Sequence, residues 1–177
     1  MVEDFFKNAA NLKNIPRQGW IDKLSIDNPE SVADHTFSMA MIGMVISDLE
    51  NLNSEKILKM ILIHDLSESI IGDIIPEKMD VKEKQELENN AFGKIMEKLP
   101  EPLITEYGKI WKEYQENSSP ESKIVHQIDK LEMALQAKIY QEQGYSQEKL
   151  KVFLKSAKKS ITHPKLKELF TKIITEN

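Results

Sequence analysis

The sequence predicts an all-α fold, a single-domain helical bundle, and three features of the chain lead to that prediction. No stretch alternates apolar and polar residues over the length of a β-strand, and only 6 of the 177 residues are glycine. Residues that begin and end helices recur along the whole chain instead. The length matches one domain of ordinary size, so we expect residues 1–177 to form a single domain.

The first two predicted helices occupy residues 2–12 and 31–49. The first ends before Pro16, because a proline disfavours helical backbone in the residue that precedes it. Ser31 is a suitable N-cap for the second, and Asp34, three positions later, completes a capping-box arrangement. The apolar positions of this helix recur at helical spacing: Phe37, Met41, Met44 and Val45.

The third and fourth predicted helices occupy residues 54–72 and 80–98. Ser54 is the expected N-cap of the third helix, and Gly72 is its expected end. This helix is strongly apolar through Ile57, Leu58, Ile61 and Leu62. The fourth helix is polar, with an inward stripe of Leu87, Ala91, Phe92 and Ile95.

Proline and serine mark the remaining helices. A fifth helix follows the prolines at positions 100 and 102 and ends near Asn117. The pair Ser119-Pro120 provides an N-cap and a first-turn residue for a sixth helix that runs to about Gly144. Ser146 or the pair His163-Pro164 then begins one or two terminal helices.

The composition excludes several classes of protein and of site. The chain has 24 basic and 29 acidic residues, a net charge of −5, so nonspecific binding to nucleic-acid polymers is not expected. It has no cysteine, so any metal must be held by histidine and carboxylate side chains. The N-terminus does not resemble a signal peptide, and no apolar stretch is long enough to cross a bilayer. We therefore expect no membrane association and a cytoplasmic location.

The apolar helix over residues 54–72 contains unexpected chemistry. It carries His64, Asp65 and Glu68, although burying an ionised carboxylate is costly without a compensating partner. At about 100° per residue, Glu68 lies between His64 and Asp65 around the helix axis, so all three side chains can face one point. Taken alone, the pair His64-Asp65 is better explained as a core histidine bonded to a neighbouring aspartate, because short motifs often match by chance.

Two further residues are also potential metal ligands beside the apolar positions of a helix. His35 lies in the first turn of helix 31–49, and Asp129 lies on the sixth helix among apolar positions that should face inward. Together with His64 and Asp65 they form a mixed nitrogen and oxygen set. Such a set suits a divalent ion such as manganese, iron, cobalt, nickel or zinc, with water completing the coordination shell.

The order His35, His64-Asp65, Asp129 resembles the signature of the HD-domain metal-dependent phosphohydrolases. Four sequence blocks are similar to those of the 5′-deoxynucleotidase branch: Pro16-Arg-Gln-Gly-Trp20, Pro29-Glu-Ser-Val-Ala-Asp-His35, His64-Asp-Leu-Ser-Glu-Ser-Ile-Ile-Gly-Asp73 and Gln127-Ile-Asp129. The resemblance extends over about residues 12–140, with the C-terminal helices expected to pack on that core. In bacterial members the arginine and tryptophan are adjacent, whereas here two residues separate Arg17 from Trp20, as in the eukaryotic form.

The resemblance implies an all-α HD-domain fold in a homodimer, with one metal ion. By this resemblance the metal ligands are His35, His64, Asp65 and Asp129. The implied reaction is hydrolysis of 2′-deoxyribonucleoside 5′-monophosphates to deoxyribonucleoside and phosphate. Cobalt or manganese is the expected metal, and magnesium, zinc, nickel or iron is an alternative.

Roles for three polar residues follow from their places in the matching blocks. Glu68 is expected to orient or deprotonate the attacking water, with a surface or salt-bridged helix residue as the alternative. Asp73 is expected either to act as a general acid or to bind the sugar, unless it is only a turn residue. Arg17 is the only arginine among 24 basic residues, and its planar, permanently charged group suits a substrate phosphate.

Trp20 is expected to contact the sugar and crowd a 2′-hydroxyl, and core packing is an equal alternative. Glu30 or Asp34 could accept a hydrogen bond from the His35 ring, and a helix cap is the alternative for Asp34. His126 lies one turn before Asp129, but we expect it to be a partly exposed or core histidine.

Two other functions stay open at this point. A related phosphohydrolase could act on guanosine tetraphosphate or on a cyclic nucleotide, although the chain lacks the extra histidines of a two-metal site. A noncatalytic nucleotide-sensing module could keep the metal as a structural clamp, but Glu68 would then have no function.

Overall fold

A computed structural model of the chain describes residues 1–175, and within that range its regular structure is helical. One isolated β-bridge joins Pro16 and Ser31. The all-α prediction is confirmed. The α-helices are α1 (Val2–Asn11), α2 (Gln18–Leu24), α3 (Val32–Leu49), α4 (Ser54–Ile63), α5 (Glu68–Ile71), α6 (Val81–Met96), α7 (Glu101–Glu116), α8 (Pro120–Glu142), α9 (Gln147–Ser160) and α10 (Pro164–Thr175), and the 3₁₀-helices are η1 (Leu12–Asn14) and η2 (Pro76–Lys78).

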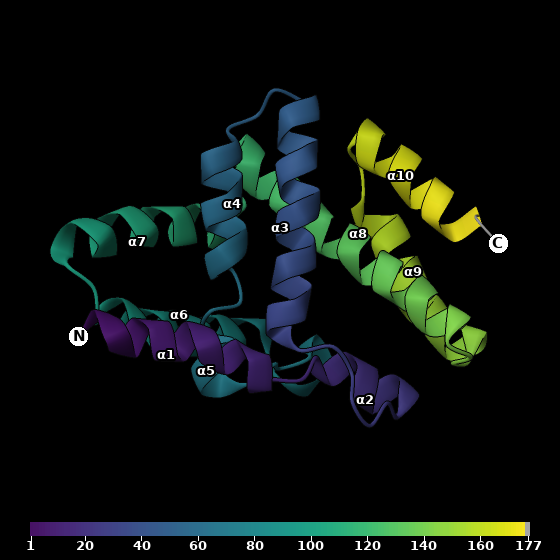
Figure 1. Cartoon of the computed structure of the whole chain (residues 1–177), viewed down its shortest axis with the longest axis horizontal. Coiled ribbons are helices and arrows are strands. Elements are labelled where there is room, and N and C mark those ends of the chain that lie inside the picture. The colour runs from purple at the N-terminus through teal and green to yellow at the C-terminus, as the bar shows by residue number, and fades with distance from the viewer. Residues whose placement is uncertain (176–177) are drawn as a thin grey trace.

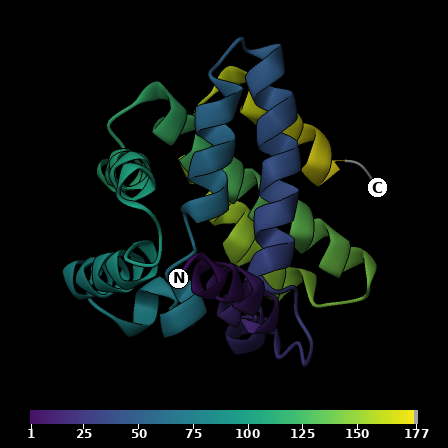
Figure 2. The ribbon, with the colours of Figure 1, turned by 60° about the vertical axis from the view of Figure 1, so that its left-hand side comes forward.

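An antiparallel pair of helices, α3 and α4, stands at the centre of the molecule (Figure 1). The long helix α8 crosses behind this pair and contacts both of its members, and α9 and α10 pack against α8. Figure 2 shows the same pair from another side, with α7 and α6 to the left of α4. Because α3 and α4 are antiparallel, the first turn of α3 lies at the same end of the pair as the last turn of α4.

The core between these helices is built from aliphatic side chains. Met39 and Ile46 of α3, Ile57 and Ile61 of α4, and Ile128 of α8 are all at most 2% exposed. A side chain at position 43 of α3 would meet the side chains of two of these residues, which explains the glycine there. This close packing of α3 against α4 fixes the distance between their functional ends.

The start of α3 is defined by a capping box, as the sequence predicts. The Asp34 amide donates to Ser31 Oγ at 3.1 Å, and the Ser31 amide donates to Asp34 Oδ2 at 2.9 Å. Just upstream, the amide of Arg17 donates to the carbonyl of Glu30 at 3.0 Å, which ties the segment before α2 to the segment before α3.

The helix predicted over residues 54–72 is interrupted, which corrects the sequence prediction. Helix α4 begins after the N-cap Asn53 rather than after Ser54, and it ends at Ile63. Residues 64–67 form turns, and α5 then extends only from Glu68 to Ile71. Hydrogen bonds between residues three apart replace the α-helical pattern here, such as that from the Glu68 amide to the Asp65 carbonyl at 3.0 Å.

Two further differences concern short elements and the chain end. The sequence analysis missed α2, because seven residues that include Gly19 give no clear apolar period. Both proposed starts of a terminal helix are used, since Ser146 caps α9 and α10 begins at Pro164. Within residues 1–175, no helix is both long enough and apolar enough to cross a membrane.

The stripe of apolar residues in α3 faces away from the core. Phe37 is 68% exposed, and Met41, Met44 and Val45 are between 39% and 49% exposed. The helical spacing therefore predicts the helix correctly, but it does not identify the face that α4 and α8 cover.

Replacing Gly43 by alanine should destabilise the protein by about 1–3 kcal/mol, because the new methyl group would overlap the fully buried Ile61 side chain. Gly93 of α6 is the matched control, since its alanine would meet no atom within 4 Å and should add about 0.5–1 kcal/mol of stability. Urea denaturation of both variants measures these changes. A Gly43→Ala variant as stable as Gly93→Ala would contradict the close packing of α3 on α4.

Candidate active site and metal centre

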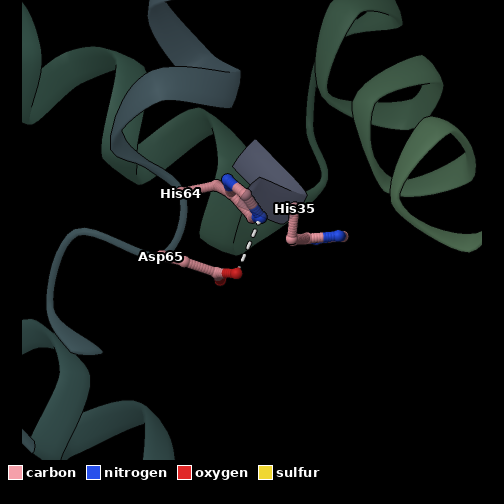
Figure 3. A group of neighbouring side chains, drawn as sticks. All are labelled: His35, His64 and Asp65. Atoms are coloured by element: carbon pink, nitrogen blue, oxygen red, sulfur yellow. Dashed lines mark ion pairs between the residues drawn. The ribbon is translucent and has the colours of Figure 1, made fainter. Parts of the chain in front are cut away.

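Two buried histidines meet at the common end of α3 and α4. His35 lies in the first turn of α3 and His64 directly follows α4, and their side chains are 0% and 1% exposed. Each offers a ligand atom that lies within 4.8 Å of the other and of an Asp65 oxygen. Figure 3 shows the side chains of His64 and Asp65 directed toward the position of His35.

Each imidazole has one ring nitrogen engaged and the other without a hydrogen-bond partner. His64 Nδ1 lies 2.6 Å from the carbonyl oxygen of Ile61, and His35 Nδ1 lies 2.5 Å from Glu132 Oε2. The Nε2 atoms of both rings are buried and make no hydrogen bond within residues 1–175. Buried ring nitrogens without partners are costly, so these two atoms indicate a ligand.

Carboxylates face both of these free nitrogens. Asp65 Oδ2 lies 3.0 Å from His64 Nε2, and Asp129 Oδ1, contributed by α8, lies 3.3 Å from His35 Nε2. Asp129 is not part of the 4.8 Å group and joins the site through His35. The structure thus brings together the four residues that the resemblance implies as ligands, from three separate parts of the chain.

Both carboxylates are held in the ionised form. Burial acts to raise the pKa of Asp65, but the neighbouring His64 ring and the charge of Arg17 hold it below its usual value. Burial acts in the same way on Asp129, and Lys130, with Nζ 2.9 Å from Asp129 Oδ2, together with His35 holds its pKa well below the usual value. Two ionised carboxylates and two imidazole nitrogens are a donor set that fits a divalent transition-metal ion.

Arg17 lies beside this group. Its Nη1 atom is 3.4 Å from Asp65 Oδ2, and its side chain is 17% exposed. Burial works against its charge, but Asp65, Asp73 and Asp129 more than offset that effect and raise the pKa of Arg17. The guanidinium is therefore a permanent positive charge at the edge of the site.

Glu68 is buried at the start of α5, with 4% of its surface exposed, so the alternative of a surface residue is excluded. Its Oε2 atom is buried and has no hydrogen-bond partner in the part of the chain that the structure describes. Burial and the neighbouring carboxylates of Asp65 and Asp73 raise the pKa of Glu68 well above its usual value. A carboxyl group with a raised pKa is suited to exchanging a proton near neutral pH.

Asp73 follows α5 and has a second, structural contact. Its Oδ2 atom accepts a hydrogen bond of 2.7 Å from the amide of Gln18, the first residue of α2. Because Arg17 immediately precedes that residue, this bond holds the arginine segment against the loop after α5.

Except for the fully buried His35, the site residues line one cavity of about 410 Å³, large enough for a small organic ligand. Its charged lining includes Arg17, Glu68 and the aspartates described above. Its apolar lining comes from α2, α8, α9 and the loop after α5: Trp20, Ile75, Met133, Val152 and Phe153. The cavity therefore combines a charged reaction centre with a surface for a flat, apolar group.

Trp20 both packs in the core and borders the cavity. It is 2% exposed, its ring centroid lies 4.1 Å from that of Phe153, and its Nε1 atom donates to Glu30 Oε1 at 2.8 Å. Core packing and contact with a bound sugar, the two alternatives for Trp20, are therefore compatible. Tyr140 completes its surroundings, with ring centroids 5.1 Å apart.

His126 is not part of the metal-binding group. Its Nε2 atom lies 3.0 Å from the carbonyl oxygen of Tyr114, and the two rings stack with centroids 4.2 Å apart. Tyr114 itself lines the cavity.

The sequence analysis missed Glu132, and the two residues suggested in its place have other partners. Asp34 caps α3, and Glu30 accepts the hydrogen bond from Trp20. Glu132 is 2% exposed and lies three residues after Asp129 on α8. An acidic residue one turn from a proposed ligand, on the same buried helix face, was the signal available in the sequence.

Comparisons with known proteins give one consistent result. A family model described as "HD domain" matches residues 9–170. The human protein 5′-deoxynucleotidase HDDC2 is 36% identical over 173 residues, which cover 97% of this chain and 84% of that protein. The fission-yeast 5′-deoxynucleotidase hdd1 is 35% identical over 181 residues, covering 99% of this chain and 89% of that protein. Among solved structures, the PH0347 protein from Pyrococcus horikoshii OT3 has 34% identity and a TM-score of 0.78, covering 98% of both chains.

The surroundings of His35 predict how the stability of the metal-free protein depends on pH. Burial and Arg17 act to lower the pKa of His35, but the carboxylates of Asp129, 3.3 Å from Nε2, and of Glu132, 2.5 Å from Nδ1, raise it to about 9. The pKa of His35 in the unfolded chain is about 6.5. The stabilisation that the protonated His35 ring contributes is therefore complete below pH 6.5 and is lost as the pH rises through about 9. We expect the melting temperature to fall over this range, and to fall less in a His35→Gln variant.

His126→Gln is the control for that measurement. Burial lowers the pKa of His126, so its contribution to stability changes only below about pH 6.5, and the variant should keep the wild-type slope between pH 6.5 and 9. Differential scanning calorimetry of the three metal-free proteins gives the slopes. Equal slopes in the wild type and in His35→Gln would contradict the raised pKa.

Proposed function

This chain belongs to the HD-domain family, and from that premise we propose that it hydrolyses 2′-deoxyribonucleoside 5′-monophosphates in a metal-dependent reaction. The observation that carries the proposal is the pair of buried imidazole nitrogens without hydrogen bonds among the described residues, which face two ionised carboxylates beside the cavity that Arg17 lines. The relatives named 5′-deoxynucleotidase, matched over nearly the whole chain, support the choice of substrate. In this proposal residues 1–177 act as one HD domain.

The metal would be held by His35, His64, Asp65 and Asp129. The chemistry that a divalent cation supplies at such a site is polarisation of the phosphoryl group and acidification of water. Nitrogen and carboxylate donors without sulfur suit a divalent transition-metal ion. The resemblance to the HD-domain phosphohydrolases favours cobalt or manganese in our proposal, with magnesium, zinc, nickel or iron as alternatives.

Arg17 would bind the substrate phosphate. Its guanidinium borders the cavity and carries a permanent charge, and its planar group can donate two parallel hydrogen bonds to phosphate oxygens. The hydrogen bond that Nη1 donates to Asp65 is long, at 3.4 Å, so a phosphate oxygen would replace it at little cost.

Glu68 would transfer a proton in the reaction, and Asp73 would either do so or bind the sugar. Glu68 Oε2 has no hydrogen-bond partner among the described residues and would accept a proton from the attacking water, which the raised pKa of Glu68 favours. Asp73 also borders the cavity, and it would either donate a proton to the leaving 5′-oxygen or bind the sugar.

The apolar side chains of the cavity lining would bind the nucleoside. Trp20 and Phe153 border the cavity with aromatic surface, which suits stacking with a sugar or base. Trp20 is held from two sides, by Phe153 and by the hydrogen bond to Glu30, so it cannot move aside to admit an additional hydroxyl group. This fixed position would account for a preference for deoxyribose.

The proposal includes action as a homodimer in the cytoplasm. The exposed apolar stripe of α3, consisting of Phe37, Met41, Met44 and Val45, supports a dimer. In Figure 1 this helix lies at the front of the molecule, where no other helix covers it. A surface helix that is apolar on all sides is typical of an interface.

Phosphate release from dAMP, dGMP and dTMP, compared with AMP, tests the activity. With manganese or cobalt we expect turnover of the three deoxynucleotides and much weaker turnover of AMP. Removal of the metal with a chelator should abolish turnover, and adding manganese back should restore it. Equal turnover of dAMP and AMP, or none on any of the four, would refute the deoxynucleotidase assignment.

Two glutamate variants sharpen this experiment. Glu68→Gln should lower kcat by about 10²-fold or more with manganese binding retained, because the amide cannot accept the proton of water. Glu86→Gln, at an exposed position of α6, is the control and should have wild-type kcat. A Glu68→Gln enzyme with wild-type kcat would exclude the proton-transfer role.

A charged residue on the apolar stripe should separate a dimer into monomers. We expect the wild type to have the mass of a dimer in light scattering coupled to size-exclusion chromatography, and Met41→Asp to have the mass of a monomer. Val152→Asp is the control, because Val152 is also about 44% exposed but lies on α9. A wild-type monomer, or a dimeric Met41→Asp variant, would contradict dimerisation through α3.

A further inference from the structure

We propose that Glu132 is a positioning residue for the metal centre, which fixes the ring of His35 so that Nε2 is presented to the metal. The inference rests on the proposed function, because it takes His35 as a metal ligand. It adds a role for a residue outside the group of four ligands.

The contact between the two side chains is short and fully enclosed. Glu132 Oε2 lies 2.5 Å from His35 Nδ1, and the side chains are 2% and 0% exposed. A carboxylate in such a place costs free energy unless a partner compensates for its lost hydration. The Nδ1–H group of His35 is that partner, so the two side chains hold each other in place.

The other histidine shows what such a contact does. A carbonyl oxygen can only accept, so the Ile61 carbonyl at 2.6 Å requires His64 to carry a proton on Nδ1. In the neutral ring this leaves the lone pair on Nε2, the atom that faces Asp65. Glu132 does the same for His35, whose Nε2 atom faces Asp129. Both rings therefore present Nε2 to the same site.

The hydrogen-bond acceptors of the two histidines come from different parts of the chain, and only that of His35 depends on a distant side chain, Glu132. His64 is oriented by the backbone of its own helix, whereas the acceptor for His35 lies 97 residues along the chain on α8. Asp129, three residues before Glu132, lies on the same face of α8. One rigid helix thus contributes a ligand and also orients a second ligand on α3.

Other carboxylates near His35 do not provide this contact. Glu30 also lies in a group with His35 and Glu132, but its Oε1 atom accepts the hydrogen bond from Trp20. Asp34 is bonded to Ser31 at the start of α3. The acceptor for His35 Nδ1 is Glu132.

Manganese affinity, measured by electron paramagnetic resonance of free Mn²⁺, tests the inference without relying on turnover. We expect Glu132→Leu, which keeps the bulk but has no acceptor, to bind Mn²⁺ about 10–100-fold more weakly than wild type. Glu132→Gln keeps an acceptor oxygen and should recover most of the affinity. Glu142→Gln, at an exposed position of the same helix, should bind as wild type does. Circular dichroism reports whether each variant is folded.

A measurement on the wild type covers the case in which Glu132→Leu does not fold. In the zinc-loaded protein, ¹⁵N NMR of the imidazole rings should show His35 with its proton on Nδ1 and the metal on Nε2. A proton on Nε2, or wild-type Mn²⁺ affinity in a folded Glu132→Leu variant, would overturn the positioning role alone. Wild-type protein that binds no Mn²⁺ would overturn the proposed metal site and this inference with it.

Discussion

The rest of the structure depends on the burial of charged and polar groups around one point at the end of the α3–α4 pair. Asp65 and Asp129 stay ionised there because His64, Arg17 and Lys130 lie next to them. The Nε2 atoms of the two imidazoles remain without hydrogen bonds. Such an arrangement is unfavourable in a protein interior unless a cation completes it. The interrupted helix after Ile63 and the cap of α3 both place side chains at this point.

Helix α3 has two functions that its sequence does not separate. Its first turn carries His35 into the site, and its inner face packs on α4 and α8. Its outer face is also apolar, so nearly the whole circumference of the helix consists of apolar residues. Hydrophobic periodicity identifies a face only when the opposite face is polar, and this explains why Phe37 and Met41 could not be assigned to the surface. The outer face becomes interpretable only when the neighbours of α3 are known.

Local signals predicted the helix ends where capping chemistry is strong. Ser31 with Asp34, and Ser119 with Pro120, begin helices as expected, and Asn117 ends one in the left-handed conformation. The prediction failed where tertiary contacts override local preference. The sequence predicts one helix over residues 54–72. In the structure the ring of His64 is turned toward His35 and hydrogen-bonded to the Ile61 carbonyl, and the chain departs from α-helical geometry there.

The sequence by itself determined the kinds of donor that this protein can use, because it has no cysteine, four histidines and a single arginine. It also determined the order of the motif residues and the family to which they belong. Only the tertiary structure decided which groups touch. Glu132 lies 97 residues from His35, and its contact exists because α8 packs across α3. Pairings of this kind depend on the relative placement of whole helices, and no local pattern in the chain encodes that placement.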